Sequence, residues 1–128
     1  MSKLIFNPTN MMKPVGYSHV AKVTGGSLVY IAGQVSADVS GNLVGEGNLE
    51  AQADQVFKNL KTAVEAAGGT MADVAMNHIF LTDWADYGAI NTVYAEYFPG
   101  DKPARYCVKA SLVKQDALIE IASVAHVG

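Results

Sequence analysis

The feature that most constrains the fold is one long amphipathic helix predicted to begin after Asn48. Asn48 is a favourable N-cap residue, and the two glycines at 68–69 favour the end of a helix. A helix with one apolar stripe must bury it against another element, so the rest of the chain has to supply a partner surface. The residues of this stripe recur every three or four positions: Ala53, Val56, Phe57, Leu60, Ala63, Val64 and Ala67.

The segments around this helix predict that the partner surface is a β-sheet. A second helix is expected over about 87–98, and the expected strands cover 3–6, 19–23, 28–35, 74–82, 104–112 and 119–125. The run at 28–35 is almost continuously apolar, which is typical of a strand covered on both faces. Gly33 within it indicates a bulge or the close approach of another group. This order of elements predicts one α+β domain over 1–128, with both helices on one face of the sheet.

Composition favours an oligomer and argues against a nucleic-acid-binding protein. Half of the 128 residues are hydrophobic and only 16% are charged, against about 25% in a typical domain. A monomer with so few charges would expose apolar surface, which favours assembly. The net charge of −3 gives no basis for binding nucleic acid.

The cysteine, histidine and hydropathy patterns predict the compartment and the absence of membrane and metal partners. Cys107 is the only cysteine, so we expect a reducing compartment and a cytoplasmic protein. No run of apolar residues is long enough to span a membrane, so no membrane partner is expected. The three histidines and the cysteine have none of the paired spacings of a zinc site, so we expect no metal.

Two charges in the last two predicted strands indicate a small anion site. The planar guanidinium of Arg105 suits a carboxylate, and Glu120 could position or deprotonate a water. If these strands formed a simple hairpin, the two residues would lie roughly 13–17 Å apart, too far for one small substrate. Either the strands are not neighbours or the site combines two subunits. Cys107 as a nucleophile would need a nearby base, which no histidine is placed to supply.

A set of motifs in fixed order resembles the RidA, or YjgF, family of reactive-intermediate deaminases. The resemblance covers essentially the whole chain. The short motifs that carry it are Gly16-Tyr17-Ser18, Ala32-Gly33-Gln34, Phe80-Leu81-Thr82-Asp83, Val93-Tyr94, Tyr97-Phe98, Pro103-Ala104-Arg105 with Cys107, and Ile119-Glu120-Ile121. A longer match is the helix that runs from Gln52 through Asn59-Leu60 to Ala66-Ala67-Gly68.

The resemblance implies a chorismate-mutase-like α+β fold. In that fold two helices pack on one face of a six-stranded mixed sheet, and another strand separates the last two. Members form homotrimers with sites between subunits and use no cofactor. They hydrolyse enamines and imines of the 2-aminoacrylate and 2-iminopropanoate type to a 2-keto acid and ammonia. The substrate is thus a small carboxylate.

The same resemblance implies roles for six residues of this chain. Arg105 would clamp the substrate carboxylate and Glu120 would position the attacking water. The side chains of Tyr17 and Tyr87 would wall the cleft. Backbone groups of two further residues would hydrogen-bond the ligand, and these are Gly33 and Cys107.

Four departures from the family pattern leave other functions open. One is that the family's Gly-Pro-Tyr appears here as Val15-Gly16-Tyr17. Ala32 stands where the family often has serine, His19 replaces a common glutamine, and Tyr87 replaces a usual phenylalanine. One alternative is therefore a binding module for small 2-keto or amino acids without catalysis. Another is an RNA-cleaving translation inhibitor, an activity attached to relatives, against which the acidic net charge argues.

Overall fold

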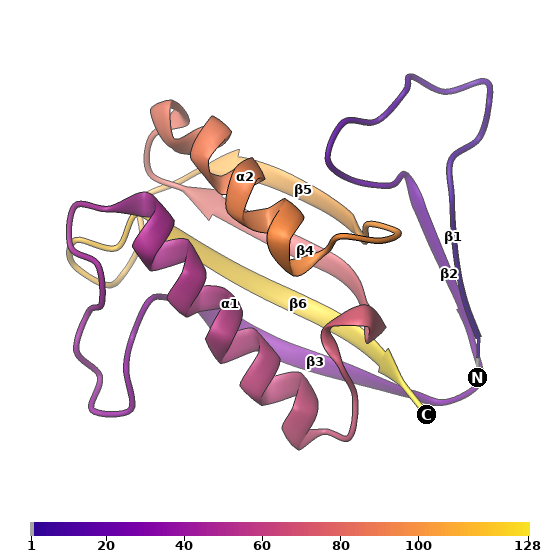
Figure 1. Ribbon diagram of the computed structural model, residues 1–128, viewed down its shortest axis with the longest axis horizontal. Helices are drawn as coiled ribbons and strands as arrows, with labels where there is room; N and C mark the ends of the chain where they lie inside the picture. The colour runs from indigo at the N-terminus through magenta and orange to yellow at the C-terminus, as the bar shows by residue number, and fades with distance from the viewer. Residues whose placement is uncertain (1) are drawn as a thin grey trace.

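The computed structural model describes residues 2–128 and has two α-helices and six strands (Figure 1). The helices are α1 (Leu49–Ala66) and α2 (Tyr87–Tyr97). The strands are β1 (Ser2–Phe6), β2 (Val20–Thr24), β3 (Ser27–Gln34), β4 (Val74–Leu81), β5 (Ala104–Lys109) and β6 (Ile119–Val127). Every predicted element is present, with ends shifted by a few residues.

Four strands form a mixed sheet in the order β3-β6-β4-β5, in which only β4 and β5 are parallel. Both helices lie on the same face of this sheet, as predicted (Figure 1). β4 lies between β5 and β6, so the last two strands are not neighbours. The α+β class and the inserted strand are therefore confirmed, and the simple hairpin is excluded.

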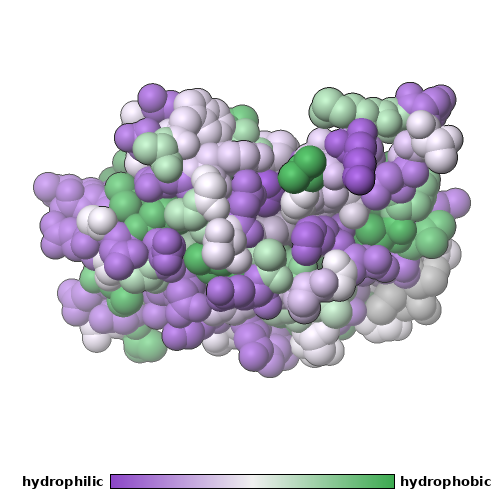
Figure 2. All heavy atoms as spheres, turned by 45° about the horizontal axis from the view of Figure 1, so that its top comes forward, coloured by the Kyte–Doolittle hydropathy of each residue, from purple (hydrophilic) through white to green (hydrophobic). Residues whose placement is uncertain are grey.

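The expectation of a single six-stranded sheet is wrong for one copy of this chain. The strands β1 and β2 instead form a two-stranded sheet of their own. Gly25 and Gly26 adopt positive φ angles of 68° and 62°, and the chain there turns away from β3. The β1–β2 hairpin lies near the connection between α2 and β5 (Figure 1). The Ser18 amide donates to the Pro103 carbonyl at 3.2 Å and helps to hold it there. Hydrophobic atoms are visible at this end of the molecule (Figure 2).

The sequence explains why α1 lies where it does. The Asn48 side chain accepts a hydrogen bond from the Ala51 amide at 3.0 Å, which caps the helix start. Phe57, Leu60 and Val64 are fully buried against the sheet. Gln52 is fully buried as well, and its side-chain oxygen accepts from the Leu118 amide at 2.8 Å. This bond ties α1 to the start of β6, the strand that carries Glu120.

The opposite face of the sheet is covered by neither helix. On β3 the side chains of Leu28 and Tyr30 are 54% and 75% exposed, and Tyr106 and Val108 on β5 are also exposed. The prediction that 28–35 is covered on both faces is therefore wrong for a single chain. We call this uncovered surface the open face. Neither helix described within residues 2–128 is long and apolar enough to cross a membrane.

Candidate active site

Arg105 lies on the helix face of the sheet, where α2 fixes its guanidinium. The Nη2 atom donates to Asn91 Oδ1 at 2.6 Å and to the Tyr87 hydroxyl at 3.4 Å. The guanidinium carbon sits 4.6 Å from the centre of the Tyr94 ring, a cation–π contact. Burial raises the pKa of the Tyr94 phenol, so the ring stays neutral beneath the cation. These contacts hold one edge of the guanidinium rigidly.

The other edge of the guanidinium is buried without a protein partner. Arg105 Nη1 has no hydrogen-bond partner among the described residues. A buried donor left unpaired costs on the order of 1–3 kcal/mol, and more when it is charged. A carboxylate paired with Nη1 would remove this cost, and the side chains that now cover this atom would have to move to admit it. The site is thus suited to a small anionic ligand.

The N-terminal loop helps to build a cavity around this side chain. Gly16 has a φ of +78°, and a Cβ built on it would lie 3.6 Å from Arg105 Nη2. The cavity has a volume of about 260 Å³. It is lined by Tyr17, Tyr87, Arg105, Tyr106 and Cys107. Four of the six predicted site residues therefore meet in one place within a single chain, and we call this the arginine half-site.

The other two predicted residues, Gly33 and Glu120, meet elsewhere. The pairing of β3 with β6 shifts between Ile31 and Gln34, which confirms the bulge expected at Gly33. A Cβ at Gly33 would lie only 2.5 Å from Glu120 Oε2, so a larger residue would displace this carboxylate. The close approach predicted for this glycine is confirmed as well. We call this pair the glutamate half-site.

The two half-sites lie on opposite faces of the sheet. Arg105 is paired with Asn77 on β4, whereas Glu120 is paired with Phe80 on the same strand. Successive side chains alternate between faces, so an offset of three residues puts the two charges on opposite sides. Strand spacing and rise together separate their Cα atoms by roughly 14 Å. Within one chain, Arg105 and Glu120 cannot hold the same small molecule.

Four residues that support the site were given no role in it from the sequence. Asn91 and Tyr94 contact Arg105 directly, and the Asn77 side chain donates to the Tyr94 hydroxyl at 2.9 Å. Ser123 donates to Asn77 at 2.5 Å and completes a buried chain of hydrogen bonds. The helical spacing of Tyr87, Asn91 and Tyr94, four and then three residues, could have revealed the face of α2 that meets Arg105.

Replacing Asn77 with leucine is expected to lower the free energy of unfolding by about 2–4 kcal/mol, because the Tyr94 and Ser123 hydroxyls lose buried partners. Chemical denaturation of the two proteins measures this difference. Thr92→Val is the matched control, because the Thr92 hydroxyl donates only to a backbone carbonyl of its own helix at an exposed position. Equal unfolding midpoints for Asn77→Leu and the unmodified protein would contradict the expectation.

Comparison with known proteins assigns the family. A sequence model of the family described as endoribonuclease L-PSP matches residues 9–127. YyfB of Yersinia pestis, a Rid-family protein of unknown function, is 34% identical over 99% of this chain and 100% of its own, with a TM-score of 0.91. This chain belongs to the Rid family.

Two further Rid structures match nearly the same share of the chain but superpose less closely. RidA of the Antarctic bacterium Psychrobacter sp. is 32% identical over 95% of this chain and 94% of its own, with a TM-score of 0.74. YyfA of Yersinia pestis is 32% identical over 98% of this chain and 100% of its own, also with a TM-score of 0.74.

The environment of Cys107 in this Rid protein disfavours a thiolate. Burial raises the pKa of the thiol, and the nearby Arg105 offsets this only in part. We therefore expect iodoacetamide to label Cys107 several-fold more slowly in the folded protein than in the urea-unfolded protein at pH 8, with a folded-state rate that still rises above pH 9. Mass spectrometry of the labelled chain measures both rates. A folded-state rate that is already constant between pH 7 and 9 would contradict this expectation.

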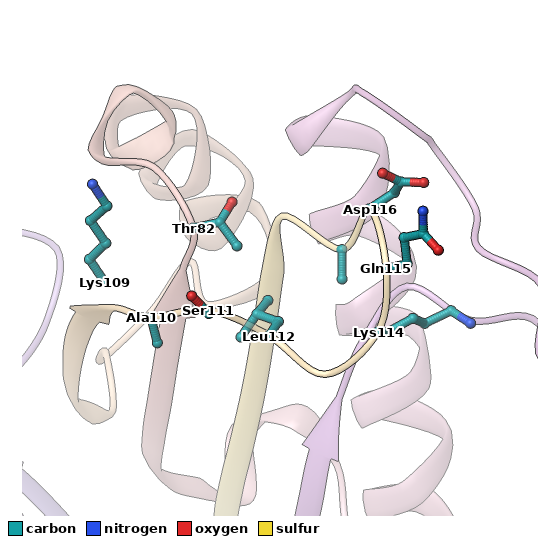
Figure 3. A pocket seen from close by; sticks show the side chains of 9 residues that line it. Thr82, Lys109, Ala110, Ser111, Leu112, Lys114, Gln115 and Asp116 are labelled. Atoms are coloured by element: carbon teal, nitrogen blue, oxygen red, sulfur yellow. The ribbon is translucent and has the colours of Figure 1, made fainter.

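A larger hollow of about 560 Å³ lies at the loop that joins β5 to β6. Figure 3 shows that Lys109 and Lys114 lie on different sides of it and point away from each other. None of the six predicted residues lines it. Among the described residues, no group of three or more histidine, cysteine or acidic side chains is placed to hold a metal.

Proposed function

We propose that this Rid protein hydrolyses small reactive enamines and imines of the 2-aminoacrylate and 2-iminopropanoate type to a 2-keto acid and ammonia. The observation that carries the proposal is the Arg105 guanidinium. One edge is fixed by Asn91 and Tyr87, and the other carries a buried, unpaired Nη1. Its cavity of about 260 Å³ suits a substrate of three or four carbon atoms.

In this proposal the substrate carboxylate accepts hydrogen bonds from Arg105, with Tyr17 and Tyr87 beside it. Backbone groups at Gly33 and Cys107 hold the remaining polar atoms. Glu120 takes a proton from water as the water oxygen bonds to the imine carbon, and this proton passes to the nitrogen. Glu120 then transfers the hydroxyl proton of the resulting carbinolamine to its nitrogen as the C–N bond breaks, which releases ammonia and leaves the 2-keto acid. An enamine substrate first gains a proton at its methylene carbon and loses one from nitrogen, which gives this imine. No cofactor enters this sequence.

Because the two half-sites face opposite sides of one sheet, the proposed active site combines two copies of the chain. We propose a homotrimer in which the arginine half-site of one copy meets the glutamate half-site of the next. The exposed apolar side chains of the open face, among them Leu28, Tyr30 and Val108, would be buried in this assembly. Light scattering is expected to give a mass three times that of the chain, and a monomer at micromolar concentration would contradict the shared site.

The direct test generates 2-aminoacrylate in situ and follows the 2-keto acid. We expect the protein to accelerate its formation over the rate in buffer. The acceleration should saturate with substrate and be inhibited by small 2-keto acids, which would occupy the same guanidinium. A rate equal to that in buffer, with correctly assembled protein, would reject the hydrolase.

A non-catalytic binding module remains the second candidate, and Ala32 is the observation that favours it. This residue precedes Gly33 next to the glutamate half-site and offers no hydroxyl to a ligand. Calorimetry that detects saturable binding of 2-keto acids, together with an inactive protein, would select this candidate. The endoribonuclease in the family description is disfavoured for this chain by its net charge of −3 and its small cavity.

A further inference from the structure

We propose that the β1–β2 hairpin is exchanged between neighbouring copies, so that β2 of one copy pairs with β3 of the next. This inference rests on the proposed two-copy site and specifies how its halves are joined. Each arginine half-site would keep its own Tyr17, and the exchanged strand would bring the partner's Glu120 to it. Four observations lead to this arrangement.

First, two strand edges are unpaired. Within residues 2–128, β2 pairs only with β1, and β3 pairs only with β6. An exposed strand edge is a row of free amides and carbonyls that readily accepts another strand. Next to these edges the chain also exposes apolar side chains, with Phe6 39%, Leu28 54% and Tyr30 75% exposed. The two edges can therefore pair through their backbone hydrogen bonds, and a neighbouring strand would lie beside the exposed apolar side chains of β3.

Second, the sequence between the two strands favours their pairing. Two glycines between strands are typical of a two-residue hairpin whose turn needs positive φ at both positions. Gly25 and Gly26 have φ angles of 68° and 62°, yet β2 does not fold back along β3. Instead it lies near the connection between α2 and β5 (Figure 1). A neighbouring copy can supply the pairing that the sequence favours and the single chain does not make.

Third, this pairing would join the two half-sites. Counted outward from the Gly25-Gly26 turn, the hairpin register sets Val23 opposite Leu28 and Ser18 opposite Gly33. In an exchanged pair the strand ladder ends at Val20, opposite the partner's Ile31, because the Ser18 amide stays bonded to Pro103. Ser18 then lies near the partner's Gly33, beside the partner's Glu120. Tyr17 is the next residue along and lines the Arg105 cavity of its own chain. The exchanged strand thus carries the missing carboxylate to the arginine.

Fourth, contacts within the chain hold the hairpin in the position that exchange requires. Ser18 is buried and forms a parallel bridge with Ala104, the residue before Arg105. Lys3 Nζ donates to the Val74 carbonyl at 3.2 Å. If the hairpin instead folded back onto its own β3, these contacts and the place of Tyr17 beside Arg105 would be lost. Exchange keeps them and pairs both free edges.

Disulfide trapping tests the exchange. The variant Val23→Cys/Leu28→Cys is made in a Cys107→Ser background, so that its two cysteines are the only ones in the chain. In the hairpin register this is a non-hydrogen-bonded pair, whose spacing suits a disulfide. Under mild oxidation we expect covalent dimers and trimers on non-reducing gels that collapse to monomers on reduction. The single variants Val23→Cys and Leu28→Cys are the matched controls and are expected to give no trimers.

Two outcomes would overturn the exchange. One is a disulfide within a single chain, seen as a monomer that has lost both free thiols. The other is a folded protein whose two thiols both remain free. If this variant does not fold, the second non-hydrogen-bonded pair, Ala21→Cys/Tyr30→Cys, gives the same readout.

The imine assay separates this inference from the proposed function. A disulfide within one chain in a protein that hydrolyses 2-aminoacrylate would reject the exchange and leave the hydrolase standing. Covalent trimers formed by a protein whose unmodified form has no activity would reject the hydrolase and leave the exchange standing.

Discussion

Replacement of Arg105 by alanine is expected to lower kcat/KM for 2-aminoacrylate hydrolysis by about 10²–10⁴, because two charged hydrogen bonds of roughly 1.5–3 kcal/mol each are lost. The assay measures the rate of 2-keto acid formation with each protein, after subtraction of the rate of hydrolysis in buffer alone. The variant removes a buried Nη1 that has no partner, but also the hydrogen bonds to Asn91 and Tyr87 and the contact with Tyr94. The assay is therefore run well below the melting temperature of the variant, which is measured alongside.

Two further variants show whether the guanidinium itself is required. Arg105→Lys keeps the charge but removes the planar pair of donors, so most of the loss is expected to remain. Lys109→Ala removes a positive charge from the exposed end of the same strand and should leave kcat/KM within about twofold, because surface charges act weakly at a distance. If Arg105→Ala also stayed within twofold, the proposed carboxylate clamp would be wrong.

Co-assembly of two inactive variants is expected to restore activity. Glu120→Gln alone should lower kcat by about 10²–10⁴, the usual range for a general base. In trimers assembled at random from equal amounts of the two variants, a Glu120→Gln chain still supplies Arg105 and an Arg105→Ala chain still supplies Glu120. A site is intact when it takes its arginine from the first kind of chain and its glutamate from the second. About a quarter of the sites are then intact, as expected for random assembly around a closed ring.

The deciding comparison is between variants that assemble together and variants that are mixed only after each has formed trimers. Co-expressed or co-refolded variants should recover activity, whereas intact trimers mixed after purification should recover it only as fast as subunits exchange. A site built within one chain would stay inactive in every mixture. Complete absence of recovery in verified mixed trimers would therefore contradict the two-copy site, even if each variant alone behaved as expected.

The local elements could be predicted from the sequence because each depends on nearby residues. The apolar stripe and Asn48 predicted α1, and the role of Gly33 followed from a glycine inside an apolar strand. The faces on which Arg105 and Glu120 lie could not be predicted. They depend on the register of both strands against β4, and a shift by one residue would reverse a face.

The position of the β1–β2 hairpin could not be predicted from the sequence either. Glycines at 25–26 permit both a tight turn back onto β3 and the turn away that the structure has. Contacts distant in sequence decide between the two, among them the bond from the Ser18 amide to the Pro103 carbonyl. The support of Arg105 by Asn91 and Tyr94 depends in the same way on how α2 docks against β5.

The placement of Arg105 and Glu120 on opposite faces of one sheet has a consequence for how such a protein is switched off. A separated subunit would keep both charged side chains and its folded core, yet hold no complete site. Activity per chain would therefore fall on dilution, along the dissociation curve of the assembly and well before any unfolding. The unit that turns over substrate would be the junction between two neighbours, and the concentration of the protein would itself regulate its rate.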